Sequence, residues 1–286
     1  MITWPRSLVT EIAERRCAIF MGSGCSSSCA SSAVASAKLP TWKALLEDMS
    51  NSSLTEPADK DEVASLLAKD KFLEAAQVIR DGSLAQEFSS FIDRTFVRPR
   101  YKPSKLHELI YLLDAKIVIS PNYDTIFEDY CRQFSNNISH NVCTYYQSHA
   151  LNDIRSDKRV ILKMHGCVTD PNQIVLSRSD YFEARRKWSS FYSILDAIFL
   201  TNTILFLGAG LSDPDVQLIL ENVHIAAPST NYHYAVIGSG RHHSEIAALK
   251  KTNNIHVLEY SDGDFTVLEN SLEALVSEVE EYRSAP

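Results

Sequence analysis

Four short stretches of the sequence carry residue types that can bind a nucleotide and act on it. One is a glycine turn, Gly22-Ser23-Gly24, which follows an apolar run, and another glycine turn begins at Gly208. Between them lie Asn122-Tyr-Asp124 and His165-Gly166, each after a further apolar run. Glycines let a backbone take positive φ values and approach phosphate closely. An amide, a carboxylate and an imidazole can bind ribose and move protons, so the combination indicates chemistry on a nucleotide.

Each stretch has a simpler structural explanation when it is taken alone. A glycine turn can merely join a strand to a helix, and Asn-x-Asp is common in turns. A single histidine after a strand is more often a structural residue with satisfied hydrogen bonds. In a parallel sheet, however, the carboxyl ends of the strands lie along one edge, where ligands bind. We therefore expect the four stretches to converge on one site.

Alternating strands and helices predict the fold that brings these stretches together. Strands are expected at 18–21, 116–120, 142–146, 160–164, 203–207, 233–237 and 255–260. Strand–helix alternation of this kind is typical of α/β proteins with a doubly wound, Rossmann-like parallel sheet. Residues 43–114 carry apolar residues at helical spacing over a length that exceeds an ordinary crossover, so we expect a helical insertion there. Thr41 and Asp213 are expected to cap helices. We expect residues 1–286 to form a single catalytic domain.

Composition excludes several classes of function. The chain has 286 residues, of which 45% are hydrophobic and 22% charged, with a formal net charge of −8. No basic block offsets this charge, so nucleic-acid binding is not expected, and the cations of residues 178–187 are expected on a solvated helix face. The sequence shows neither a membrane-spanning run nor a signal-peptide pattern, so we expect a cytoplasmic protein. The six cysteines form no Cys-x-x-Cys pair, so neither zinc nor disulfides are expected.

The motifs, taken in order, resemble the sirtuin catalytic core. They are Gly-x-Gly-x-Ser at residues 22–26, Asn122-Tyr-Asp124, Lys163-Met-His-Gly166 and the segment from Gly208 to Asp215. Together with Leu39-Pro-x-Trp42, these forms are similar to the bacterial sirtuin-like branch found in anti-phage defence. The resemblance spans about residues 17–260. It implies an NAD-binding doubly wound sheet that cleaves the bond between nicotinamide and ribose.

The resemblance also implies a role for each matching residue. Asn122 would hold the ribose next to nicotinamide or the water that attacks it, and Asp124 would hold the nicotinamide carboxamide. His165 would act as a base toward the ribose hydroxyls or the water, and Gly208 would line the adenosine side. The residues that would face the pyrophosphate and the nicotinamide-side ribose are Gly22, Ser23, Gly24 and Ser26.

Departures from deacetylating sirtuins narrow the expected reaction. Those enzymes carry a zinc module of four cysteines and an Asp-Phe-Arg run after the glycine turn, and this sequence has neither. Gly210 also stands where they usually show Ser. Without an acyl-lysine acceptor, water becomes the nucleophile. We therefore predict an NAD glycohydrolase that forms nicotinamide and ADP-ribose and depletes NAD during infection. The alternatives are an NAD-dependent protein deacylase or ADP-ribosyltransferase, and a module that senses NAD or ADP-ribose without catalysis.

The predicted activity must be controlled, because an unrestrained NAD hydrolase would be toxic to its own cell. The catalytic core and its insertion fill the chain, so control is expected from self-assembly or from a separate partner. We therefore predict a homo-oligomer, and the resemblance implies a HerA-like hexameric ATPase as a partner. The apolar helix faces of residues 43–114 are the expected assembly surface, unless they pack on one another as core.

Overall fold

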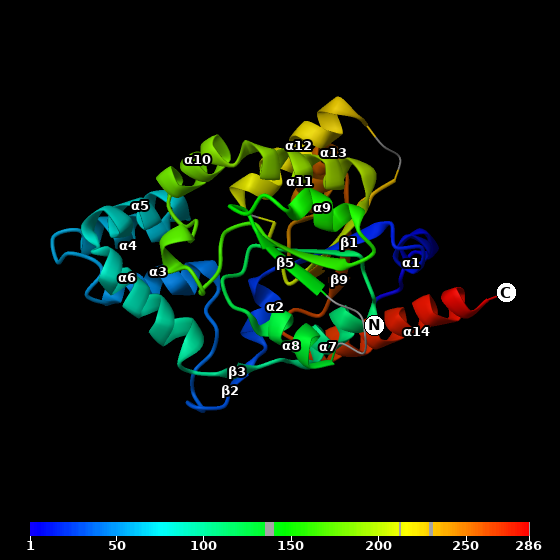
Figure 1. The fold of residues 1–286 in the computed structure, drawn as a ribbon, viewed down its shortest axis with the longest axis horizontal. Coiled ribbons are helices and arrows are strands. Elements are labelled where there is room, and N and C mark those ends of the chain that lie inside the picture. The colour runs from blue at the N-terminus through cyan, green and yellow to red at the C-terminus, as the bar shows by residue number, and fades with distance from the viewer. Residues whose placement is uncertain (135–139, 212, 229–230, 286) are drawn as a thin grey trace.

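A parallel sheet lies at the centre of the computed structural model, which describes residues 1–134, 140–211, 213–228 and 231–285 (Figure 1). In these residues the sheet has seven strands in the order β5-β6-β4-β1-β7-β8-β9, and neighbouring strands pair in parallel. The strands are β1 (Cys17–Met21), β4 (Ile117–Ser120), β5 (His140–Thr144), β6 (Arg159–Lys163), β7 (Thr203–Leu207), β8 (His233–Gly238) and β9 (Ile255–Tyr260). The predicted α/β fold with a doubly wound parallel sheet is confirmed.

Helices cover both faces of the sheet. Successive residues of a strand point to opposite faces, so Ile19 and Met21 of β1 pack into one apolar core, whereas Ala18 and Phe20 pack into another. The first core contains residues of α1 (Arg6–Ala13), α7 (Lys105–Leu112), α8 (Ile126–Phe134) and α14 (Phe265–Ser284). The second contains residues of α9 (Ala150–Arg155), α10 (Arg178–Lys187), α11 (Ser189–Thr201) and α12 (Pro214–Ala226), with α13 (His243–Asn253) packed against it. No helix in the described part of the chain combines the length and the apolar composition of a membrane span.

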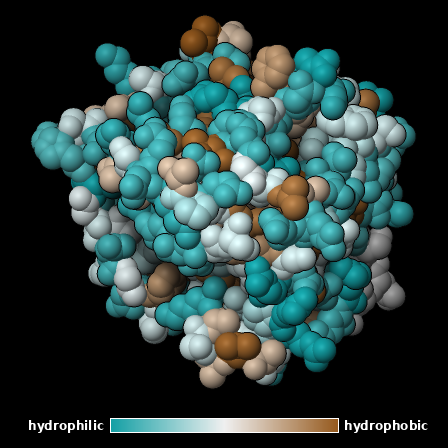
Figure 2. Space-filling model, turned by 90° about the vertical axis from the view of Figure 1, so that its left-hand side faces the viewer, coloured by the Kyte–Doolittle hydropathy of each residue, from teal (hydrophilic) through white to brown (hydrophobic). Residues whose placement is uncertain are grey.

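Four helices between β1 and β4 form a cluster with an apolar core of its own, beside the sheet at the left of Figure 1. They are α3 (Trp42–Asn51), α4 (Lys60–Ala68), α5 (Phe72–Gly82) and α6 (Ala85–Ile92). Their apolar faces, from Leu45 to Ile92, are mostly buried against one another. The outer surface of this end of the molecule is mainly hydrophilic, with scattered apolar residues (Figure 2). The faces that the sequence offered as an assembly surface are therefore largely occupied by internal packing.

The expectation of helix throughout residues 43–114 is wrong at one place. Tyr101–Lys102 forms β3, which pairs antiparallel with β2 (Ala30–Ser31). A π-helical turn, η1 (Asp93–Val97), precedes it and follows α6. Strands of two residues are too short to show a period-two pattern, so hydrophobic periodicity cannot detect them.

Two helix starts follow the predicted capping residues. The Thr41 hydroxyl accepts a hydrogen bond from the backbone nitrogen of Ala44 at the start of α3. Oδ1 of Asp213 accepts from the backbone nitrogens of Asp215 and Val216, at 2.9 and 3.1 Å, at the start of α12. Because this cap uses only one carboxylate oxygen, Oδ2 of Asp213 is left to contact other groups.

The strand order creates a crevice at the centre of the sheet. Strands β1 and β7 are neighbours, but the chain leaves β1 toward β4 on one side and leaves β7 toward β8 on the other. Open α/β sheets bind ligands at such a switch point, outside the carboxyl ends of the strands. The short helix α2 (Ser23–Ser27) follows β1 directly at this edge.

Candidate active site

The glycine turns after β1 and β7 lie against each other, backbone to backbone. A Cβ atom at Gly22 would lie 2.4 Å from the carbonyl oxygen of Gly208, and one at Gly208 would lie 2.4 Å from the backbone nitrogen of Cys25. Gly208 has a φ of +61°, whereas Gly22 has a φ of −89°, and Gly24 is not among the glycines with positive φ. The expected positive φ at Gly22 and Gly24 is therefore wrong. Both positions need glycine because the facing turn leaves no room for a side chain.

The side chains of Asn122 and Asp124 are joined through a serine of α2. Nδ2 of Asn122 donates to the carbonyl oxygen of Gly22 at 3.1 Å and to Oγ of Ser26 at 3.0 Å. Oγ of Ser26 donates in turn to Oδ2 of Asp124 at 2.8 Å. The other oxygen of Asp124 accepts from the backbone nitrogen of Ile126, at the start of α8. These hydrogen bonds tie the turn after β4 to the turn after β1 and fix both side chains.

A buried ion pair holds the Asn122–Asp124 turn from the side of β6. Nζ of Lys163 lies 2.7 Å from Oε1 of Glu128 and donates to the main-chain oxygen of Asp124. The two side chains are 1% and 3% exposed. Burial raises the pKa of the Glu128 carboxyl, and Lys163 offsets only part of that rise. Burial lowers the pKa of the Lys163 ammonium, but Glu128 and Asp124 raise it by more. In the sequence, Lys163 is marked only by its place in the Lys163-Met-His-Gly166 motif, and no local pattern marks Glu128.

His165 lies between two carboxylates at the start of α12. Its Nε2 is 3.4 Å from Oδ2 of Asp215, and its Nδ1 is 3.6 Å from Oδ2 of Asp213. Burial lowers the pKa of the imidazole, but Asp213 and Asp215 raise it by more, so that the pKa lies above the usual 6.5. His165 therefore takes up a proton more readily than a free histidine. It can act as a base only once the pH exceeds this raised pKa.

Two residues of α10 bind the carboxylates that flank His165. The Tyr181 hydroxyl donates to Oδ2 of Asp213 at 2.9 Å, and its ring packs on the imidazole with 4.9 Å between centroids. Arg185 forms an ion pair and a hydrogen bond with Oδ1 of Asp215. The expected solvated face of residues 178–187 is therefore wrong for Arg185. The sequence signal that was missed is the one-turn spacing of Tyr181 and Arg185.

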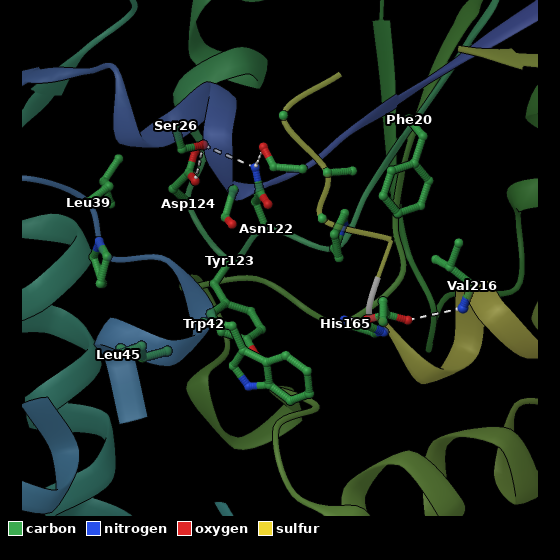
Figure 3. Close-up of a pocket in the computed structure, with 18 of the residues that line it drawn as sticks. Phe20, Ser26, Leu39, Trp42, Leu45, Asn122, Tyr123, Asp124, His165 and Val216 are labelled. Carbon is green, nitrogen blue, oxygen red and sulfur yellow. Dashed lines mark hydrogen bonds and ion pairs between the residues drawn. The ribbon is translucent and has the colours of Figure 1, made fainter. Parts of the chain in front are cut away.

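These groups line one cavity at the carboxyl edge of the sheet (Figure 3). The cavity measures about 860 Å³, and part of this space is open to solvent. The opposite wall is apolar and includes Leu39, Trp42 and Leu45, which lie across the cavity from His165 in Figure 3. The predicted site residues that line it are Gly22, Ser23, Ser26, Asn122, Asp124, His165 and Gly208.

A second, more open cavity adjoins the first across the turn after β7. It measures about 1410 Å³ including open solvent, and Gly24 lines this cavity rather than the first. Residues 208–210 border both cavities. Arg241 donates to the carbonyl oxygen of Gly210 at 2.9 Å, which fixes this turn from the side of β8. Ser212, which belongs to the motif from Gly208 to Asp215, lies outside the described residues. An elongated ligand could occupy both cavities.

Potential metal ligands gather at one place in the described residues: His165, Asp213 and Asp215, whose ligand atoms lie within 4.8 Å of one another. Both carboxylates already have partners in the protein, because Asp215 pairs with Arg185 and Asp213 accepts a hydrogen bond from Tyr181. The six cysteines are free, buried thiols. Burial raises the pKa of Cys25 to about 12 and that of Cys29 to about 11, so both thiols are protonated at neutral pH.

Fold and site together define the class of the protein. A parallel α/β sheet with glycine turns and a set of polar groups in one cavity at its carboxyl edge is typical of nucleotide-binding α/β proteins. Residues 116–258 match the sequence profile of the SIR2-like domain family. This match covers half of the chain, so the chain belongs to that family.

Relatives that share this similarity come from several bacteria. The chain is 24% identical over 218 residues to NAD(+) hydrolase ThsA of Acinetobacter baumannii, covering 76% of this chain and 41% of that protein. It is 26% identical over 239 residues to NAD(+) hydrolase ThsA of Bacillus cereus, covering 81% and 45%. It is 22% identical over 158 residues to Defense-associated sirtuin 2 of Bacillus subtilis, covering 54% and 15%. The chain thus spans less than half the length of the relatives it matches.

Proposed function

We propose that this protein is an NAD glycohydrolase. It would add water to C1′ of the nicotinamide ribose and release nicotinamide, ADP-ribose and a proton. The observation that carries the proposal is the joint placement of Asn122, Asp124 and His165 in one cavity that also contains the glycine turns after β1 and β7. The ThsA relatives, which are named as NAD(+) hydrolases, support the same substrate.

The two adjoining cavities suggest how a dinucleotide would lie. The nicotinamide ribose would occupy the first cavity, where Asn122 and His165 are, and the adenosine end would occupy the second. The pyrophosphate would then cross the shared turn beginning at Gly208, where backbone groups are within reach because no Cβ atoms intervene. Such a placement keeps the roles that the sequence resemblance implied for Ser23, Gly24 and Ser26.

The residues of the first cavity can supply what cleavage of this bond needs. Nicotinamide leaves as a neutral base, so no strong general acid is required, and catalysis depends on a fixed geometry and on a base for the water. The donors of Asn122 are already used by Gly22 and Ser26, so its carbonyl oxygen is the atom to accept from a ribose hydroxyl or from water. Asp124 would hold the nicotinamide carboxamide. His165 would accept the proton of the water.

The experiment is to incubate the purified chain with NAD⁺ and to measure nicotinamide and ADP-ribose by chromatography. Asn122→Ala and His165→Ala should each lower turnover by about a hundredfold or more while the protein stays folded. His149→Ala is the matched control, because this histidine lies just before α9, its side chain is 45% exposed, and it forms an ion pair with Asp153. Near wild-type turnover by His165→Ala would refute the role of His165. Nicotinamide release only in the presence of an acyl-lysine peptide would indicate a deacylase instead.

We further propose that residues 1–286 act as a single catalytic domain with a helical insertion at about 43–114. Copies of this chain would assemble with one another and bind a HerA-like ATPase as a partner. The separate apolar core of α3–α6 supports the insertion, whereas the sequence resemblance supports the assembly. In the cell, the activity would deplete NAD during phage infection. Light scattering of the chain alone and with the ATPase, together with the NAD⁺ assay, tests this. A monomer that is fully active alone and does not bind the ATPase would refute it.

A further inference from the structure

Helix α10 connects the helical cluster to the candidate active site. Figure 1 shows it running from α5 toward α11 and α12. At its beginning, Arg178 pairs with Glu74 of α5, and the backbone nitrogen of Ser179 donates to Oε1 of Gln77 at 2.9 Å. The N-terminal end of α10 is therefore fixed to the cluster, and its remaining turns reach His165.

The face of α10 that meets the site carries two residues one turn apart. Tyr181 and Arg185 are at positions i and i+4, which places them on the same side of the helix. Each binds a different carboxylate: Tyr181 binds Asp213 and Arg185 binds Asp215. One helix thus satisfies both acidic neighbours of His165 at once.

The groups around His165 and its two carboxylates come from three elements. The start of α12 supplies Asp213 and Asp215, and α10 supplies Arg185 and Tyr181. The third is α11, whose Tyr192 lies near Asp215 and has a buried hydroxyl with no hydrogen-bond partner among the described residues. The fixed charges are two carboxylates and one guanidinium, and that guanidinium lies on the far oxygen of Asp215, opposite the oxygen that faces the imidazole.

We propose that Arg185 and Tyr181 are positioning residues for His165: by holding Asp215 and Asp213, they set the orientation of the imidazole and the strength of its attraction to a proton. Arg185 shares the charge of Asp215, so less of that charge acts on the imidazole. Tyr181 fixes Oδ2 of Asp213 and packs on the ring itself. The part of this inference that concerns catalysis rests on the proposed function, whereas the arrangement around His165 does not.

Two variants should move the protonation of His165 in opposite directions. In Arg185→Gln, the charge of Asp215 acts on the imidazole alone, and the pKa of His165 should rise further. In Asp215→Asn, which keeps the shape of the side chain, one attracting charge is lost and the pKa of His165 should fall. Arg186→Gln is the matched control, because Arg186 is the next residue of α10, is 57% exposed and pairs with Glu183. A merely structural role would not produce shifts of opposite sign.

The test is an NMR titration of histidine-labelled full-length protein, in which the His165 signal is identified by its loss in His165→Gln. Opposite shifts in the two variants, with none in Arg186→Gln, are expected. If Arg185→Gln does not fold, Tyr181→Phe decides: it removes the hydroxyl that binds Asp213, so the pKa of His165 should rise. This readout needs no turnover, so failure of NAD⁺ cleavage would refute the proposed function and leave this inference standing.

In the NAD⁺ assay, the ratio of the rate at about pH 8 to the rate at about pH 6 should rise by about threefold or more in Arg185→Gln. Unchanged titration of His165 in Arg185→Gln, or shifts of the same sign in the two variants, would overturn the inference.

Discussion

Replacing Gly208 by alanine tests whether the turns after β1 and β7 touch backbone to backbone. Two effects lower the free energy of unfolding of Gly208→Ala, and they add. The first is the positive φ of +61°, which costs a residue with a Cβ about 1 kcal/mol. The second is the overlap with the backbone nitrogen of Cys25, 2.4 Å from the new Cβ, which a flexible side chain cannot relieve. Forced shifts of a packed region cost about 1–3 kcal/mol. The free energy of unfolding should therefore fall by about 2–4 kcal/mol.

The chain offers a matched control for the first cost. Gly263 has a φ of +75°, and a Cβ there would meet no atom within 4 Å. Gly263→Ala should therefore lose only the conformational term, about 1 kcal/mol. Urea denaturation followed by circular dichroism measures both variants, and the difference between their midpoints isolates the overlap. If Gly208→Ala proved as stable as Gly263→Ala, the two turns would not pack as described, and the combined cavity would lose its basis.

Three further predictions follow from the buried groups. The pKa of His165 is raised in the fold, so its stabilising contribution is fully present below about pH 6.5 and is lost as the pH rises through the folded-state pKa. NAD⁺ cleavage should increase over the same pH window. Denaturation and rate measurements over a pH series, with wild type and His165→Gln, check both signs. Lys163→Met leaves Glu128 buried without its partner and should lower the free energy of unfolding by about 3–5 kcal/mol. The double variant Lys163→Met, Glu128→Leu should lose less stability than the single variant, and denaturation measures both. Elemental analysis should find no stoichiometric zinc, and a chelator should leave the melting temperature unchanged; stoichiometric zinc would revive the deacylase alternative.

Local sequence patterns were sufficient for the sheet and for most of the site. Apolar strands followed by glycine or polar turns predicted the parallel sheet, because a buried parallel strand needs a continuous apolar run and its carboxyl end lies at the ligand edge. The same reasoning selected Asn122 and His165, which line the cavity. Capping by Asp213 was readable because the cap and the helix start are adjacent in the chain.

Tertiary structure alone decided which partners these residues have. Glu128 and Lys163 come from different elements, and a charged residue in a helix is ordinarily expected in solvent, so no local pattern marks the pair. Arg185 likewise looks like the other cations of α10 until the start of α12 is placed against it. Glycine at position 22 was predicted for its backbone freedom, but the close approach of Gly208 is what requires it. Sequence determines what each strand end carries, whereas packing between elements distant in the chain determines the charges and the space around it.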